Sequence, residues 1–229
     1  MIPYAQATQT NWHYINANTG TVSAYAHGAT VAGAYLGGVL APNGRIYLIP
    51  YSQANQTNWH YIDTNTGSVV AYAHGSTAVS GAYNGGCLAP NGRIYLSPSK
   101  QATEANWHYI DTNTGSVVAY PNNSGVSPIL YAYAGAVTTP NGRVYFIPSA
   151  NATQSQWHYI DVNTGNVVAY SNNVTTVESG YYMGVLAPNG RIYMIPYSQA
   201  TQPIWHYIET QSEQPLNKNV CLNPMFNKY

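Results

Sequence analysis

The residues from Gly85 to Tyr120 read GGCLAPNGRIYLSPSKQATEANWHYIDTNTGSVVAY, and this unit decides the fold. It holds four short runs of β-branched, aromatic or small residues, and turn residues separate these runs. Pro-Asn-Gly joins the first run to the second, where proline presets the first turn dihedral and glycine accepts a positive φ. Asn-Thr-Gly joins the third run to the fourth. The unit therefore predicts a four-stranded antiparallel sheet with two tight hairpins.

The same unit recurs along the chain. The string WHYI begins at residues 12, 59, 107, 157 and 205, so the repeats are 47, 48, 50 and 48 residues long. Four antiparallel strands repeated every 40 to 50 residues or so are typical of β-propeller blades. We therefore predict an all-β, five-bladed β-propeller of four-stranded antiparallel blades, in a single domain that spans residues 1–229.

The two ends of the sequence share one incomplete repeat. MIPY at Met1–Tyr4 matches MIPY at Met194–Tyr197, so the first blade lacks its own first strand. VCLNP at Val220–Pro224 matches GCLAP at Gly86–Pro90, which predicts that the C-terminal strand completes the first blade and closes the ring. Both cysteines then replace valine-sized residues on inner strands rather than forming a disulfide.

The fifth blade has little room for its outer strand. Twelve positions separate Glu209 from Cys221, where 24 positions separate Asp63 from Cys87. Either SEQPL at Ser212–Leu216 forms a short outer strand, or the third strand of this blade is an exposed edge that pairs with another chain.

Charge is scarce in this chain. Seven Lys and Arg and seven Asp and Glu make 6% charged residues and a formal net charge of zero, where soluble proteins average about 25% charged residues. So few cations cannot build a basic face for nucleic acid or for an anionic membrane surface. The 45% of hydrophobic residues exclude disorder, and no apolar run is long enough to insert into a bilayer. The first ten residues also lack the pattern of a signal peptide.

Two sets of repeated residues are predicted to be structural. The first is a cross-strand pair of opposite charges between the second and third strands, each pair worth about 0.2–1 kcal/mol. The pairs are Arg45 with Asp63, Arg93 with Asp111, Arg143 with Asp161, and Arg191 with Glu209. The second set is tryptophans that we expect to pack between blades, with an aromatic platform for a sugar as the alternative. They are Trp12, Trp59, Trp107, Trp157 and Trp205.

No motif for chemistry occurs in the sequence. It contains no GxSxG, no HExxH, no phosphate-binding loop and no cluster of paired carboxylates. The histidine of each WHYI would lie far from the axis of the predicted ring, whereas a zinc site needs its ligands about 2 Å from one ion. We therefore predict that the chain is not an enzyme and that it holds no metal and no cofactor.

The segment from Asn43 to Tyr72, NGRIYLIPYSQANQTNWHYIDTNTGSVVAY, resembles a kelch-type blade, in which an Ile-Tyr strand is followed by a Tyr-Asp strand and an Asx-Thr-Gly turn. This resemblance covers nearly the whole chain. LAPNGRIY is similar to repeats of bacterial and phage propellers, and the ending LNPMFNKY is similar to the C-termini of tailed-phage structural proteins. In blade number and repeat length the chain also resembles tachylectin-type propellers, which implies a multivalent lectin.

The loops between the second and third strands suit an uncharged ligand. They share one end of the predicted propeller with the loops between blades, and Tyr51–Asn58 offers Tyr, Gln, Thr and Asn side chains. We therefore predict a non-enzymatic, multivalent module that binds carbohydrate or a cell-surface polysaccharide, because several weak sites raise avidity by about 10² to 10⁴. The candidate ligand-binding residues are Tyr4, Gln6, Tyr51, Gln53, Asn58, Gln101, Asn106, Asn151, Tyr197 and Gln199.

The alternative is a structural or protein-interaction propeller of an assembly such as a phage tail. It would use the variable loop Pro121–Gly135 to contact a protein partner, and the edge of the fifth blade to self-associate. Both functions favour an extracellular or virion-associated protein.

Overall fold

The computed structural model describes residues 1–229 except residues 3, 5–6, 29, 211–217 and 221–229. The described strands form one two-stranded and four four-stranded antiparallel sheets, which we number 1 to 5 in chain order. Sheet 1 holds β1 (Asn11–Ile15) and β2 (Val22–Ala26); sheet 2 holds β3 (Tyr35–Leu40), β4 (Arg45–Pro50), β5 (Asn58–Asp63) and β6 (Val69–Ala73); sheet 3 holds β7 (Tyr83–Leu88), β8 (Arg93–Pro98), β9 (Asn106–Asp111) and β10 (Ser116–Pro121). Sheet 4 holds β11 (Tyr133–Thr139), β12 (Arg143–Pro148), β13 (Gln156–Asp161) and β14 (Val167–Ser171); sheet 5 holds β15 (Tyr181–Leu186), β16 (Arg191–Pro196), β17 (Trp205–Glu209) and β18 (Lys218–Val220). The predicted all-β repeat of four-stranded sheets is confirmed for sheets 2 to 5.

Short 3₁₀ helices separate the second and third strands of sheets 2 to 5. They are η1 (Ser52–Asn55), η2 (Lys100–Thr103), η3 (Ala150–Thr153) and η4 (Ser198–Thr201). No helix in the described part of the chain is long and apolar enough to cross a bilayer.

Turn residues fix the two hairpins of each unit locally. In sheet 2, Gly44 has a φ of 76°, the left-handed conformation that glycine adopts without strain. The Asn43 side chain accepts a hydrogen bond from the backbone N–H of Arg45 (3.2 Å), and Asp63 accepts one from Asn65 (2.9 Å). Each hairpin is therefore held by an Asx side chain two residues before the N–H that it binds.

The register between the second and third strands is the predicted one. Arg45 pairs with Asp63 and Tyr47 with Tyr61, and the counterparts in sheets 3, 4 and 5 pair in the same way. The predicted ion pair forms in sheet 5, where Arg191 Nε lies 3.0 Å from Glu209 Oε2. Among the described residues, no other Arg or Lys lies within 4 Å of a carboxylate oxygen.

In sheets 2, 3 and 4 each charge has a different partner. The Arg45 guanidinium lies 4.4 Å from the centroid of the Tyr61 ring, a cation–π contact that its counterparts also make. The Asp63 carboxylate accepts backbone hydrogen bonds from Asn65 and Thr66 in its own turn. The carboxylate thus caps the turn, whereas Glu209, one methylene longer, reaches its arginine. The predicted cross-strand pairing of Arg45 with Asp63, Arg93 with Asp111 and Arg143 with Asp161 is confirmed by the register, but none of the three described pairs forms an ion pair.

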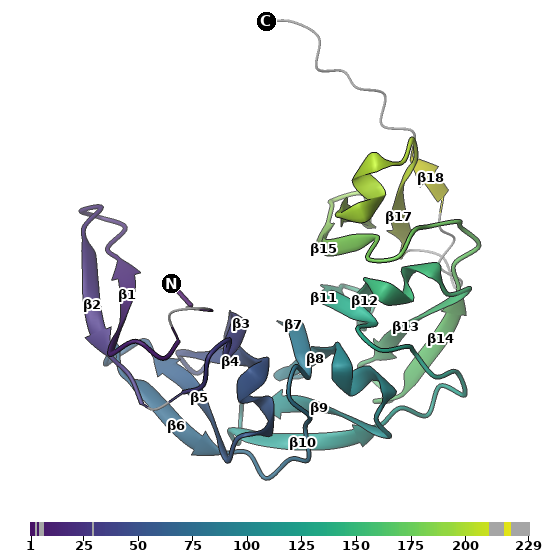
Figure 1. The fold of residues 1–229 in the computed structure, drawn as a ribbon. Helices are drawn as coiled ribbons and strands as arrows, with labels where there is room; N and C mark the ends of the chain where they lie inside the picture. The colour runs from purple at the N-terminus through teal and green to yellow at the C-terminus, as the bar shows by residue number, and fades with distance from the viewer. Residues whose placement is uncertain (3, 5–6, 29, 211–217, 221–229) are drawn as a thin grey trace, which may run out of the picture.

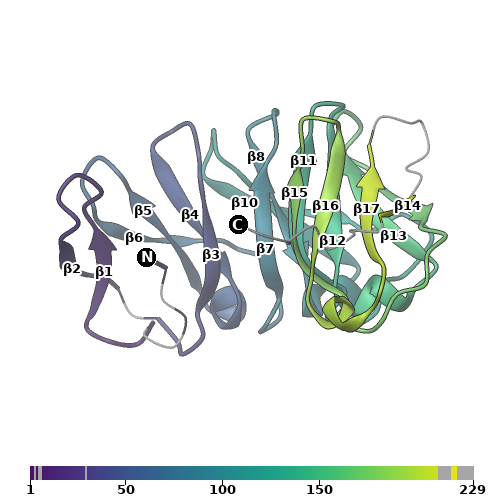
Figure 2. The ribbon, with the colours of Figure 1, turned by 90° about the horizontal axis from the view of Figure 1, so that it is seen from above.

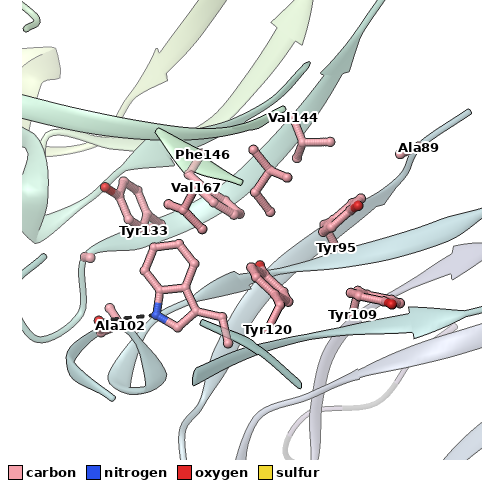
Figure 3. Close-up of a cluster of buried hydrophobic side chains, with 12 residues drawn as sticks. Ala89, Tyr95, Ala102, Tyr109, Tyr120, Tyr133, Val144, Phe146 and Val167 are labelled. Atoms are coloured by element: carbon pink, nitrogen blue, oxygen red, sulfur yellow. Dashed lines mark hydrogen bonds between the residues drawn. The ribbon is translucent and has the colours of Figure 1, made fainter. Parts of the chain in front are cut away.

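The hydrophobic core lies between neighbouring sheets. Four of the five tryptophans are buried there, as predicted: Trp12, Trp59, Trp107 and Trp157. The fifth, Trp205, is partly exposed in sheet 5. One cluster joins Tyr95 and Trp107 of sheet 3 to Phe146 of sheet 4 (Figure 3), and the Trp107 indole N–H donates to the Ala102 carbonyl at 3.3 Å.

The five sheets follow one another along an open arc. The inner strands β3, β7, β11 and β15 contact one another in chain order. Figures 1 and 2 show sheet 1 at one end of the arc and sheet 5 at the other. Across the described residues the ring is therefore not closed.

The C-terminal segment differs from its prediction. Val220 lies in β18, where it pairs with Trp205 as the outer strand of sheet 5 and not as an inner strand of sheet 1. β17 presents unpaired backbone groups at its edge, and β18 satisfies them. The other residues of the predicted closing strand, 221–224, and the predicted outer strand Ser212–Leu216 lie outside the described residues.

Candidate functional site

One end of the molecule carries all the loops that are not tight hairpins. The loops with η1 to η4 lie at this end, together with the loops that connect consecutive sheets. In Figure 2 the short helices lie along the lower edge and the hairpin turns along the upper edge. We call the surface formed by these two kinds of loop the loop face.

Four amides predicted to bind a ligand are buried beneath the loop face: Gln53, Gln101, Asn151 and Gln199. Gln53 accepts a hydrogen bond at Oε1 from the Val31 N–H (3.2 Å) and donates one from Nε2 to the Asn58 carbonyl (2.9 Å). The other three amides bridge the equivalent two positions in their own sheets. Backbone groups of loops lack strand partners and need such side chains. This corrects the prediction, because the structure uses these four amides to tie the loops together.

Three predicted tyrosines remain accessible on the loop face. Tyr4 is 51% exposed, Tyr197 is 66% exposed, and Tyr51 is partly exposed. The ring centroids of Tyr4 and Tyr51 are 6.3 Å apart, and Tyr197 lies 6.3 Å from Tyr182 at the start of β15. Serines occupy the equivalent positions in sheets 3 and 4. The aromatic side chains therefore gather in two pairs and do not repeat in every sheet.

The remaining predicted site residues divide into two groups. Asn58 and Asn106 are exposed where β5 and β9 begin. Gln6 lies outside the described residues. Ligand contact by the three tyrosines, Asn58 and Asn106 stays a prediction.

Tyr131 is an accessible aromatic residue in the variable loop Pro121–Gly135, which the alternative prediction from sequence assigns to a protein partner without singling out this residue. It lies in the loop between sheets 3 and 4 with a φ of 59°, and the equivalent loop positions hold Gly33, Gly81 and Ser179, also at positive φ. A bulky residue in this conformation is strained, and such residues cluster at functional sites. Lys100 Nζ lies 5.6 Å from the Tyr131 ring centroid. The signal in the sequence is a bulky tyrosine at a repeat position that holds glycine or serine in the other copies.

Four of the five WHYI histidines, those of sheets 2 to 5, are buried, whereas His13 in sheet 1 is partly exposed. In sheet 4 the Tyr133 hydroxyl bonds to His158 Nδ1, and His158 Nε2 donates to the Val126 carbonyl at 3.0 Å. Burial lowers the pKa of His158 to about 4, so this imidazole is neutral at pH 7. Sheets 2, 3 and 5 have the same tyrosine–histidine contact. In the described part of the chain, no three His, Cys, Asp or Glu residues cluster so as to hold a metal ion.

The arrangement of the sheets is similar to that of several solved structures. A protein from Lactobacillus plantarum superimposes with a TM-score of 0.61 over 98% of this chain and 67% of that one, at 11% identity. The extracellular domain of a protein described as a one-component system from B. thetaiotaomicron gives a TM-score of 0.60 at 10% identity. The fold is that of a repeat β-propeller.

Comparison of the sequence with known proteins does not assign the chain to a family. No family model matches the chain, and no curated protein matches it. The superposition with the B. thetaiotaomicron domain covers 94% of this chain but only 30% of that domain. A Bacteroides caccae protein of unknown function is also similar, with a TM-score of 0.55 and 13% identity over 95% of this chain and 71% of that one. At such low identities the likeness carries the fold and not the activity.

Proposed function

We propose that the chain is a non-enzymatic, multivalent binding module that holds neutral carbohydrate on its loop face. The observation that carries the proposal is that accessible tyrosines form two pairs on the loop face: Tyr4 with Tyr51, and Tyr182 with Tyr197. An exposed tyrosine presents a rigid apolar ring and a polar hydroxyl, which suit the C–H face and the hydroxyl groups of a sugar.

The charge distribution supports an uncharged ligand. All four arginines of the repeats begin the second strand of a sheet, directly after a hairpin turn at the end opposite the loop face. The loop face itself carries few charged side chains, among them Lys100 and Glu104 in the η2 loop. Two aromatic groups on one face also allow a polymer to bind at both, which raises avidity without new contacts. A lectin of this kind would act outside the cell or on a virion, and the similar B. thetaiotaomicron domain is described as extracellular.

Substituting the exposed tyrosines tests this proposal. On an array of neutral oligosaccharides we expect the wild-type chain to bind, and Tyr51→Ala and Tyr197→Ala each to weaken binding by about 2- to 10-fold, because each removes one stacking ring. Tyr14→Ala is the matched control, since Tyr14 is also an exposed tyrosine but lies on β1, away from the loop face. Binding that survives both loop variants unchanged, or falls equally in the control, would refute the assignment of the site.

A protein partner is the second candidate function. The loop between sheets 3 and 4 exposes Leu130 next to the strained Tyr131, and an apolar tip of this kind suits a protein surface better than a sugar. This candidate predicts an array without hits. It also predicts that Leu130→Asp abolishes co-purification of a partner that the wild-type chain retains.

A further inference from the structure

Sheet 5 ends the arc with an uncovered apolar face. Its Ile195 is 46% exposed, whereas the counterpart Ile49 in sheet 2 is 1% exposed because sheet 3 covers it. Tyr193 and Trp205 are likewise partly exposed, although their counterparts in sheets 2, 3 and 4 are buried. With Val185 these side chains line an open groove. In sheets 2, 3 and 4 this face packs against the next sheet. In sheet 5 no sheet among the described residues packs against it.

Sheet 1, at the other end of the arc, exposes the complementary face. Ile15 is 56% exposed, and it pairs across the two strands with Val22, which is also exposed. Its counterparts are buried in the clusters formed with aromatic residues of the preceding sheet: Ile110, Ile160 and Ile208. At the junctions of sheets 2 with 3, 3 with 4 and 4 with 5, then, this isoleucine covers the kind of groove that sheet 5 leaves open.

A polar contact marks two of these junctions, those of sheets 2 with 3 and of sheets 4 with 5. Asn43 Nδ2 donates to the Thr112 carbonyl of the next sheet at 2.7 Å, and the junction between sheets 4 and 5 has an equivalent bond of 2.7 Å. At the two ends of the arc, Asn189 of sheet 5 and Ala17 of sheet 1 hold these repeat positions. Each end of the arc therefore carries one side of the apolar contact and one side of the polar contact that a junction needs.

We propose that sheet 1 covers the open face of sheet 5 within one chain, which closes the five sheets into a ring. The two faces repeat the pairing seen where sheet 2 meets sheet 3, sheet 3 meets sheet 4 and sheet 4 meets sheet 5. A second copy docked end to end would bury the same residues. Closure within one chain is favoured because the tethered partner has a high effective concentration and loses no translational freedom.

Closure also extends the proposed binding site. Tyr4 and Tyr51 lie side by side on sheets that follow one another, and closure would bring Tyr197 beside Tyr4 in the same way. A row of three tyrosines, Tyr197, Tyr4 and Tyr51, would then cross the seam and offer successive stacking positions to an oligosaccharide. This consequence rests on the proposed carbohydrate function, whereas closure itself does not.

Chemical crosslinking tests closure directly. The variant Asn189→Cys with Ala17→Cys places one thiol on each side of the seam, and Asn43→Cys with Thr112→Cys marks a junction that the structure shows. Both pairs are made in a Cys221→Ser background. Burial of the Cys87 thiol raises its pKa to about 12, so it reacts poorly. A short bismaleimide is added to dilute protein, and the products are separated under denaturing conditions and mapped by mass spectrometry.

We expect the seam pair to crosslink within the monomer to within about twofold of the yield at the junction pair. Crosslinked dimers at the seam would overturn the proposal in favour of a second copy. A crosslinked junction pair beside an unreacted seam pair would also overturn it, because the two ends would then stay apart. Neither failure would alter the effect of Tyr51→Ala on carbohydrate binding, so the two proposals fail separately.

Trp205 provides a second readout without introduced cysteines. Subtracting the fluorescence of Trp205→Phe from that of the wild-type chain isolates the emission of Trp205. Closure predicts that acrylamide quenches this emission no more than that of the four buried tryptophans. Strong quenching, as for a solvent-exposed indole, would contradict closure.

Discussion

Replacing Trp107 with alanine is expected to lower the free energy of unfolding by about 3–5 kcal/mol. Trp107 is buried between sheets 3 and 4, where its ring meets Phe146 edge-on with centroids 5.5 Å apart. Its indole N–H also satisfies the Ala102 carbonyl of the η2 loop. Alanine would leave a cavity between two hydrogen-bonded sheets that cannot collapse freely, and would leave that carbonyl without its donor.

Urea unfolding followed by circular dichroism measures this change. Trp107→Phe is the matched control, because it fills most of the cavity and removes only the hydrogen-bond donor, and we expect it to cost about 1–2 kcal/mol. A cost below about 1 kcal/mol for the alanine variant would show that the junction between sheets 3 and 4 is not a packed core.

Acidification from pH 7 to pH 4 is expected to destabilise the fold by an amount on the order of a few kcal/mol. Burial lowers the pKa of both His108 and His158 to about 4, below the value of about 6.5 in an unfolded chain. Between these two pH values the unfolded chain takes up protons that the folded chain excludes. The stabilisation is therefore complete above about pH 6.5 and is lost as the pH falls towards 4.

Burial is the main reason why folded His158 excludes the proton, and the hydrogen-bond pattern at its Nδ1 acts in the same direction. The Asn151 amide donates to the Tyr133 hydroxyl at 2.9 Å, and His158 Nε2 donates to the Val126 carbonyl at 3.0 Å. Nδ1 is therefore the acceptor for the Tyr133 hydroxyl, and a proton on Nδ1 would face another donor. His158→Gln should reduce the loss of stability between pH 6.5 and 4 when unfolding is measured across that range. A pH dependence equal to that of the wild-type chain would exclude His158 as its source.

The hairpins and the strand register could be predicted because they depend on residues close in sequence. Gly44 and Asp63 each act within their own turn. A shift of one residue would place every side chain on the wrong face, so the pairing of Tyr47 with Tyr61 follows from the pattern of aromatic residues. Arg45 and Asp63 are cross-strand partners as predicted, but they form no ion pair, because the carboxylate finds nearer donors in its own turn.

The site and the ends of the arc could be predicted less well. A polar loop residue looks accessible in sequence, but Gln53 is buried because loop backbone groups recruit its amide. The departure of Pro121–Gly135 from the repeat marked this loop in the sequence, but the positive φ of Tyr131 within it depends on the folded loop. The place of Val220 depends on contacts across the whole arc, where an unpaired edge of β17 competes for it with sheet 1.

Calorimetric titration with a neutral oligosaccharide tests the central claim most directly, because it counts binding sites per chain. We predict more than one site on the wild-type chain, in line with the two tyrosine pairs of the loop face. The combined variant Tyr51→Ala with Tyr197→Ala should lose the heat of binding and keep its unfolding temperature. If no neutral oligosaccharide produces heat with the wild-type chain, or if the combined variant binds as tightly as the wild type, the loop face is not a carbohydrate site.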